Sequence, residues 1–260
     1  MAGRALITGA SSGLGVEFAR LAASQGYNLV ISARRADRLN ALKSELEAAH
    51  GIRVTVAQAD LTAPGEAEAL WATASDNGAG EIDLLVNNAG LGTHGPFGSQ
   101  SAREEESIAL NISAYTTLMR LAATHMTPRG SGGILNVASL AGFMPGPNMA
   151  VYHASKAYAL SLSDALHDEL RNSGVRVTAL CPGATKTEFF DAAQVDRTWL
   201  MTLLPMGTAK SVSQIGWRAL ARGKKRVVPG PLNKIIALSS RISPPFVLGP
   251  LTKWLLSKNR

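Results

Sequence analysis

The sequence predicts a doubly wound α/β protein, in which one parallel sheet of about seven strands is covered by helices on both faces. Short apolar runs alternate with longer segments of helical period along most of the chain, which is typical of such a sheet. At 260 residues the chain is near the upper size for one hydrophobic core, and it contains no internal repeat, low-complexity segment or linker. We therefore expect a single domain.

Seven apolar runs are the predicted strands. Each is too short for a core helix, and most are rich in Val, Ile and Leu. They are Ala5–Thr8, Asn28–Ala33, Arg53–Ala57, Asp83–Val86, Gly133–Val137, Arg176–Leu180 and Arg226–Val228.

Longer segments between these runs carry apolar residues at helical spacing and are the predicted helices. One of them, Arg103–Met126, is long enough to form one helix or two. The segments are Leu14–Ser24, Asp37–His50, Pro64–Asp76, Arg103–Met126 and Val151–Asn172.

The end of the chain differs in composition, so we separate a domain of residues 1–230 from a tail of residues 231–260. Five prolines between residues 229 and 250 exclude one long helix and favour two short amphipathic helices joined by an extended turn. Such a tail either folds back over a pocket of its own domain, sits in a subunit interface, or lies on a membrane surface.

Charge is unevenly distributed. Residues 1–130 carry 10 Lys and Arg against 13 Asp and Glu, whereas residues 131–260 carry 16 against 6. No acidic residue follows Asp196, although 12 basic ones do. This asymmetry indicates either an anionic partner or surface for the C-terminal part, or simply a solvated basic face; we do not expect nucleic acid binding.

The remaining composition favours a cytoplasmic protein, with membrane-peripheral contact through the tail as the alternative. The chain begins without the features of a secretory signal, and no apolar stretch is long enough for a spanning helix. Cys181 is the only cysteine, so neither an internal disulfide nor a thiolate metal cluster can form, and we expect no metal site.

A glycine-rich loop follows the first predicted strand and opens a helix. Gly9 allows a tight exit from the strand, Gly13 lets the backbone approach a pyrophosphate, and Gly15 allows close packing of helix on strand. The helix N-terminus adds free N–H groups and the positive end of a dipole. This position predicts a dinucleotide site more strongly than the glycines alone would.

The end of the second strand predicts NADP(H) in preference to NAD(H). An NAD enzyme would place an acidic residue there for the ribose hydroxyls, but Ala33 occupies the position and is followed by Arg34 and Arg35. A guanidinium suits a 2′-phosphate. The alternative is that both arginines are surface charges at the start of a helix.

Tyr152 and Lys156 are four residues apart in a helical segment and so share one face. An ammonium beside a phenol lowers the pKa of the phenol, which could then exchange a proton with a carbonyl or alcohol oxygen. Alone, the pair could be an ordinary surface pair. Ser139, however, follows the strand Gly133–Val137 and is expected at the same sheet edge as the glycine loop, with its hydroxyl available to a substrate oxygen.

Together these motifs resemble the short-chain dehydrogenase/reductase family, in its compact single-domain branch with a Rossmann-type fold. Residues 8–15, TGASSGLG, match the family's cofactor loop, residues 87–90 match its NNAG motif, and Ser139, Tyr152 and Lys156 fall at its catalytic spacing. The resemblance covers about residues 4–230, which would then be the NADP-binding catalytic domain.

The resemblance implies a role for each matching residue. Tyr152 would be the general acid or base, Lys156 would lower the pKa of Tyr152 and hold the nicotinamide ribose, and Ser139 would polarise the carbonyl. Asn111 would hold a water that links Lys156 to solvent. The implied cofactor-binding residues are Gly9, Ser11, Ser12, Gly13, Leu14, Gly15, Arg34, Arg35, Asp60, Leu61, Asn87, Ala89, Gly90, Tyr152, Lys156, Pro182, Gly183, Thr185 and Thr187.

One position departs from the family's pattern. Ser12 stands where many NADPH-using relatives have a basic residue in the glycine loop. The preference for NADPH therefore depends on Arg34, with or without Arg35, and mixed use of NADPH and NADH becomes an expectation.

Substrate choice falls in the segments with the fewest motifs: Leu91–Gly98, Gly142–Met149 and Phe189–Met206. Their apolar residues predict a hydrophobic pocket under a mobile lid, unless they serve only as core or subunit contacts. They are Phe97, Phe143, Met144, Phe189, Phe190, Trp199 and Leu203.

We therefore expect an NADPH-dependent enzyme that interconverts a carbonyl and a secondary alcohol on a hydrophobic substrate. One alternative is a 3-oxoacyl-carrier-protein reductase, whose acidic carrier would suit the basic tail. Another is a regulatory protein that senses NADP(H) without turnover. The resemblance also implies a homodimer or homotetramer.

Overall fold

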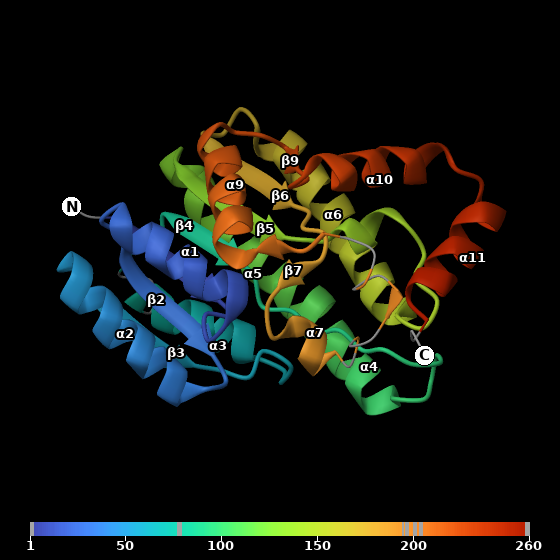
Figure 1. Cartoon of the computed structure of the whole chain (residues 1–260). Helices are drawn as coiled ribbons and strands as arrows, with labels where there is room; N and C mark the ends of the chain where they lie inside the picture. The colour runs from blue at the N-terminus through green and yellow to red at the C-terminus, as the bar shows by residue number, and fades with distance from the viewer. Residues whose placement is uncertain are drawn as a thin grey trace.

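The computed structural model describes residues 3–76, 80–193, 195, 198–199, 202 and 205–257. Within them, seven strands form one fully parallel sheet in the order β3-β2-β1-β4-β5-β6-β9 (Figure 1). The strands are β1 (Arg4–Thr8), β2 (Asn28–Ala33), β3 (Val54–Gln58), β4 (Leu84–Asn87), β5 (Gly132–Val137), β6 (Val175–Leu180) and β9 (Arg226–Val227).

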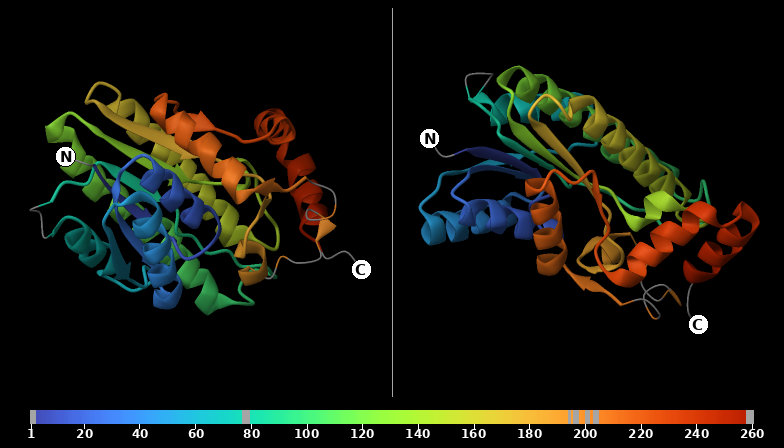
Figure 2. Two further views of the ribbon diagram at one scale, coloured as in Figure 1. Left: turned by 60° about the vertical axis from the view of Figure 1, so that its left-hand side comes forward. Right: turned by 90° about the horizontal axis from the view of Figure 1, so that it is seen from above.

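Helices cover both faces of the sheet (Figure 2). A separate hydrophobic core lies on each face. Leu70, Leu118 and Ala159 belong to the core between the sheet and α3 (Glu66–Ala74), α5 (Tyr115–Met126) and α6 (Ala150–Leu170). Phe18, Leu39 and Leu220 belong to the opposite core, under α1 (Gly13–Ser24), α2 (Ala36–His50) and α9 (Ala209–Ala221). The strands are apolar nearly throughout because both of their faces are buried.

The predicted fold class and all seven predicted sheet strands are confirmed. Arg103–Met126 forms α4 (Ser101–Ile108), a π-helical segment (Ala109–Ala114) and α5. Helix α9 was not predicted, nor was α7 (Phe189–Ala192), nor a two-stranded parallel sheet of β7 (Thr185–Lys186) and β8 (Gly207–Thr208).

Strand order places a crevice at the carboxyl ends of β1 and β4. The chain winds outward from β1 through β2 to β3 and then returns to β4 on the other side of β1. Connections therefore leave these two neighbouring strands in opposite directions, and a ligand crevice opens where they part.

The tail consists of two short helices, α10 (Pro231–Ile242) and α11 (Pro245–Leu255), as the prolines predict. They follow one another at an angle, at the end of the molecule remote from the N-terminus (Figures 1 and 2). Leu256 joins Met149 and Tyr152 in a small apolar cluster, so the tail packs on the main domain. None of the helices in the described part of the chain is both long and apolar enough to cross a membrane.

Candidate active site

A cavity of about 480 Å³ runs along the carboxyl ends of the central strands. Its wall includes most of the predicted cofactor residues, namely Gly9, Ser11, Ser12, Gly13, Leu14, Arg34, Arg35, Asp60, Leu61, Ala89, Gly90, Pro182, Gly183, Thr185 and Thr187. It also includes Ser139, Tyr152 and Lys156. Of the predicted site residues, Gly15, Asn87 and Asn111 lie outside this wall.

The glycine loop has the geometry that the sequence predicts for a phosphate cradle. Gly9 and Gly13 have φ values of +67° and +55°, which favour glycine. Helix α1 begins at Gly13, and the Ser12 side chain makes no capping hydrogen bond to it. The first N–H groups of α1 therefore remain available to an anion at the cavity wall.

Gly15 does not line the cavity but packs against the glycine loop from the side of α1. A Cβ atom added there would come within 2.1 Å of the Gly9 carbonyl oxygen, so only glycine lets α1 lie this close to the loop. Its place fits the packing role that its position in the sequence predicts.

The NNAG segment is tied to β1 through Thr8. The backbone N–H groups of Asn88 and Ala89 donate to the Thr8 hydroxyl over 3.0 and 2.9 Å, and the Asn88 amide donates to the Thr8 carbonyl over 2.9 Å. Asn87 is buried, with its amide donating to the Tyr115 carbonyl. In the structure, therefore, Asn88 rather than Asn87 lies at the cavity wall.

The basic residues after β2 differ in their partners. Arg35 donates to Glu188 over 2.7 Å and to the Ser11 hydroxyl over 3.0 Å, and Arg38 donates to the same Glu188 carboxylate over 2.5 Å. These two guanidiniums lower the pKa of Glu188. Within the part of the chain that the structure describes, the Arg34 side chain has no hydrogen-bond or ion-pair partner, so its charge is free to meet a ligand.

The far side of the cleft is lined by the segment after β6. Thr185 donates to the Gly183 carbonyl over 3.0 Å, and Thr187 lies so close to the glycine loop that a Cβ at Gly13 would contact its methyl group. At the other end Asp60 accepts two hydrogen bonds from Thr62. The cavity thus joins the carboxyl ends of β1 to β6 into one continuous site.

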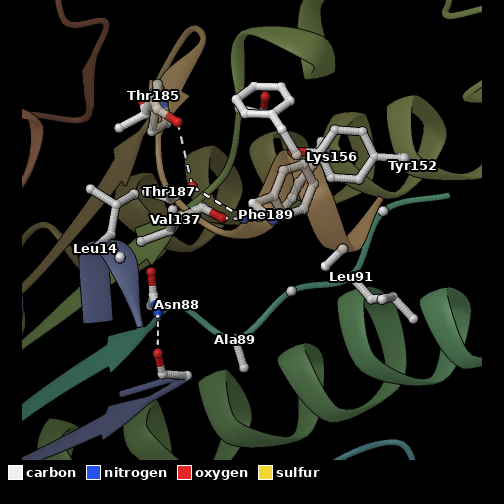
Figure 3. A pocket seen from close by; sticks show the side chains of 18 of the residues that line it. Leu14, Asn88, Ala89, Leu91, Val137, Tyr152, Lys156, Thr185, Thr187 and Phe189 are labelled. Carbon is white, nitrogen blue, oxygen red and sulfur yellow. Dashed lines mark hydrogen bonds between the residues drawn. The ribbon is translucent and has the colours of Figure 1, made fainter. Parts of the chain in front are cut away.

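Tyr152 and Lys156 lie together on α6, facing the cavity. The ammonium nitrogen of Lys156 is 5.8 Å from the centroid of the Tyr152 ring and donates to the Val137 carbonyl over 2.9 Å. Ser139 follows β5, and its hydroxyl accepts from the Ala141 N–H and hydrogen-bonds the Tyr152 phenol. Figure 3 shows the Tyr152 ring next to Phe189, with Lys156 beside them.

Burial controls the acidity of this pair. It raises the pKa of Tyr152 to about 12, against the smaller opposite effect of the hydrogen bond from Ser139, and it lowers the pKa of Lys156 to about 8. In the chain by itself the pKa of Tyr152 is therefore raised and not lowered, and the lowering by Lys156 stays a prediction for the enzyme with its cofactor. The amine points to a backbone carbonyl, and desolvation of both groups outweighs the attraction expected from their spacing.

Asn111 lies in the π-helical segment between α4 and α5 and is buried. Its amide donates to the Leu91 carbonyl and to the hydroxyls of Ser107 and Ser155, while its oxygen accepts from the Leu91 N–H. The side chain therefore joins the loop after β4 to helices α4 and α6.

The substrate end of the cavity is apolar, and Met144, Phe189 and Phe190 line it as predicted. The other predicted aromatic residues do not. Phe97 is exposed, Phe143 packs with Ala138 and Leu160, and Trp199 stacks on Trp254 with ring centroids 5.6 Å apart. Leu203 lies outside the described residues.

Several wall residues were not predicted. Ile236, Thr252, Leu255 and Leu256 come from the tail, whose path over the pocket was only one of three expectations. His153 also lines the cavity, with its Nδ1 atom 2.9 Å from the Met144 carbonyl oxygen, and burial lowers the pKa of its imidazole. The Tyr-x-x-x-Lys spacing did not point to His153. Its side chain lies at the cavity because the segment before α6 folds back to place the Met144 carbonyl beside it.

The wall fits a nicotinamide dinucleotide. The positive-φ glycines leave room at a helix N-terminus for a pyrophosphate, and the unpaired Arg34 suits a phosphate on the ribose. The Ser32 hydroxyl is buried at this wall and has no hydrogen-bond partner among the described residues, as expected of a group that meets a polar ligand. Among the described residues, no cluster of His, Cys, Asp or Glu could hold a metal ion.

A sequence profile of the short chain dehydrogenases matches residues 4–198, which is most of the chain. The chain belongs to the short-chain dehydrogenase family. It is therefore an oxidoreductase of that family, and the predicted resemblance is confirmed.

Relatives and solved structures agree with this membership. Ketoacyl reductase HetN of Nostoc sp. is 34% identical over 247 residues, which cover 92% of this chain and 84% of the relative. A short-chain dehydrogenase from Sphingobium yanoikuyae, solved in complex with NADPH, matches with a TM-score of 0.82 and 34% identity over 92% of this chain and 93% of that one. A family member from Burkholderia phymatum, solved in complex with NAD, matches with a TM-score of 0.81 and 26% identity over 100% and 98%.

Proposed function

We propose that this chain is an NADPH-dependent oxidoreductase that interconverts a carbonyl and a secondary alcohol on a hydrophobic substrate. The observation that carries the proposal is the position of Tyr152. Its phenol is buried between Ser139 and Lys156 at the wall of a cavity whose other end is a glycine loop suited to a dinucleotide. Residues 1–230 would form the catalytic domain, and residues 231–260 would close its substrate end.

The bound nicotinamide supplies or accepts a hydride at the reacting carbon. In reduction, Tyr152 gives its phenolic proton to the substrate oxygen, and a pKa raised to about 12 keeps that proton on the phenol before substrate arrives. The Ser139 hydroxyl donates to the same oxygen and fixes its direction. Lys156, held by the Val137 carbonyl, supplies positive charge next to the tyrosinate that remains.

Asn111 would support this chemistry from outside the cavity. Its side chain binds the Leu91 backbone and the hydroxyl of Ser155, one residue before Lys156, so it ties the loop after β4 to the turn of α6 that carries the lysine. We propose that it keeps open the path of a water that restores the proton of Tyr152 through Lys156.

The preference for NADPH rests on charge. Arg34 carries a free positive charge at the adenosine end of the cavity, and no acidic side chain stands at the end of β2, where Ala33 lies. Glu188, which also lines this region, is already paired with Arg35 and Arg38. A 2′-phosphate would therefore meet net positive charge.

The substrate proposal rests on the apolar wall. Met144, Met149, Phe189 and Phe190 surround the side of Tyr152 where substrate must bind, and tail residues add Leu255 and Leu256. A bulky ketone or its alcohol fits such a wall. Reduction of a 3-oxoacyl group carried by an acidic protein is a second candidate, because ketoacyl reductase HetN is 34% identical and the C-terminal half of this chain is basic.

Assembly of the chain as a homodimer or homotetramer is also proposed.

The test is Tyr152→Phe, assayed for ketone-dependent oxidation of NADPH against a panel of hydrophobic ketones and 3-oxoacyl thioesters. Loss of the proton donor should lower kcat by at least about 100-fold, while the dissociation constant for NADPH changes little. Tyr158→Phe is the matched control, because it removes a hydroxyl from the same helix, where Tyr158 is 38% exposed and its hydroxyl hydrogen-bonds Thr116. Turnover in neither the wild type nor the control, with tight NADPH binding in all three proteins, would favour an NADP(H)-sensing protein instead.

A further inference from the structure

We propose that the outer face of the tail, made by α10 and α11, is a docking surface for an anionic lipid membrane. Docking requires no catalysis and stands apart from the function proposed above. The surface is defined by eight exposed apolar side chains: Leu232, Ile235, Leu238, Ile242, Phe246, Val247, Leu251 and Trp254.

Both tail helices carry their apolar stripe on the outside. Ile235, Leu238 and Ile242 recur at the spacing of one helix face and are 64%, 65% and 80% exposed. A surface helix of a water-soluble domain normally turns such a stripe toward the core. Here the inner side of α10 is formed instead by Ala237 and Ser240, both buried.

Helix α11 adds a second set of exposed apolar side chains. Phe246 is 78% exposed, and Val247, Leu251 and Trp254 follow at helical spacing, each about half exposed. Its inner side is held by Thr252 and by Leu256, whose carbonyl lies 2.7 Å from Nε2 of His94. The two helices are thus held to the main domain by buried side chains, while the eight apolar side chains that define the surface are exposed.

The charge of the tail favours an anionic lipid membrane as the binding partner of this surface. Residues 231–260 contain five Lys and Arg and no Asp or Glu. Lys234 and Lys253 are exposed on these helices, and neither has an acidic partner within the described residues. Exposed apolar side chains flanked by unpaired lysines match an anionic lipid surface, which takes the apolar groups below its headgroups and the amines among them.

The same charges argue against a second copy of this chain. A twofold contact between two such surfaces would bring like charges together in a region that has no acidic residue to balance them. A lipid surface has no such conflict. Its apolar layer would also lie directly outside the tail residues that line the cavity, Ile236 and Leu255 among them.

The experiment is flotation of the full-length protein with two kinds of vesicle. One is made of phosphatidylcholine alone, and the other of phosphatidylcholine with about 30% phosphatidylserine. We expect binding to the anionic vesicles, much weaker binding to the neutral ones, and release by high salt. Phe246→Glu and Ile242→Glu should each lower the bound fraction at least about fivefold, because each places a charge in the apolar layer. Ile108→Glu, on α4, is the matched control for a new charge at an exposed apolar position and should bind as the wild type does.

A second pair of variants tests the charge. Lys234→Glu and Lys253→Glu should each weaken binding at least about fivefold, whereas Lys210→Glu, an exposed lysine on α9, should have little effect. Circular dichroism and thermal melting establish that each variant is folded. Equal flotation of wild type and tail variants, or equal binding to neutral and anionic vesicles, overturns the proposal. So does a fall in molar mass by light scattering in Phe246→Glu without vesicles, because the surface would then be a subunit interface.

Discussion

At the scale of single residues, the structure distinguishes Arg34 from Arg35, which the sequence alone presents as equivalent candidates for binding a 2′-phosphate. Arg35 binds Glu188 and Ser11, whereas the Arg34 side chain at the cavity wall has no polar partner in the part of the chain that the structure describes. Residues 35 and 188 are far apart in the sequence, so no local pattern could reveal their pairing. The burial of a side chain is equally invisible before folding, so the sequence could not show that the pKa of Tyr152 is raised in the chain by itself.

This difference leads to a prediction about the cofactor. Arg34→Ala should raise the dissociation constant for NADPH by about 10- to 100-fold, because a charge-assisted contact to the 2′-phosphate is lost, and should leave that for NADH nearly unchanged. Fluorescence titration with both dinucleotides measures this. Arg38→Ala is the control, since Arg38 binds the same Glu188 but does not line the cavity. An equal rise for NADPH and NADH in Arg34→Ala would contradict the 2′-phosphate assignment.

At the scale of elements, length decided most of what could be predicted, although the two-residue strand β9 was predicted and the 13-residue helix α9 was missed. The six longer sheet strands and the other long helices were predicted because each carries enough apolar residues to show a period. Strands β7 and β8 have two residues each and α7 has four, so no period can appear in them. They form from tertiary contacts, and they are the elements next to the substrate end of the site.

The contact of α1 with the glycine loop is the element-scale feature on which the cofactor site depends most. Gly15→Ala would place a methyl group 2.1 Å from the Gly9 carbonyl oxygen and 2.9 Å from the Ala10 Cα, both backbone atoms that cannot turn aside. The helix must move away, at a cost of about 2 kcal/mol or more in the free energy of unfolding. Urea denaturation should show this loss of stability, and fluorescence titration should show weaker NADPH binding.

Gly249→Ala provides the matched control. Gly249 lies inside α11, and apart from its chain neighbours an added Cβ there has no atom within 4 Å. The substitution should change the free energy of unfolding by less than about 1 kcal/mol, because the helix preference of alanine and the crowding of its Cβ by the ring of Pro250 act in opposite directions. A similar loss of stability in both variants would mean that the close approach at Gly15 is not its cause.

At the scale of the whole molecule, the fold class and the position of the crevice followed from the alternation of strands and helices, whereas the path of the tail did not. Nothing in residues 231–260 distinguishes a helix that covers its own pocket from one that covers a partner. That choice depends on the shape of the surface that receives Leu256, and this surface is assembled from α6, α7 and the loops beside them.

Burial of Lys156 links the active site to the stability of the whole chain. Its pKa is lowered to about 8 in the folded protein, against an ordinary value of 10.5 when unfolded. Between these values the unfolded chain holds a proton that the folded chain has released, so the free energy of unfolding should rise with pH across this window. Above pH 10 the raised pKa of Tyr152 acts in the opposite direction, so the measurement belongs below that pH.

Urea denaturation of the wild type and of Lys156→Met at pH 7.5, 8.5 and 9.5 isolates this contribution. Because one pKa unit corresponds to about 1.4 kcal/mol, the wild type should gain about 2 kcal/mol relative to the variant over this range. Methionine keeps most of the side-chain volume and removes the titrating amine, so other groups that titrate cancel in the comparison. Parallel pH profiles of the two proteins would show that the amine keeps its ordinary acidity in the fold, and that the charge proposed to stabilise the tyrosinate is not held in a desolvated site.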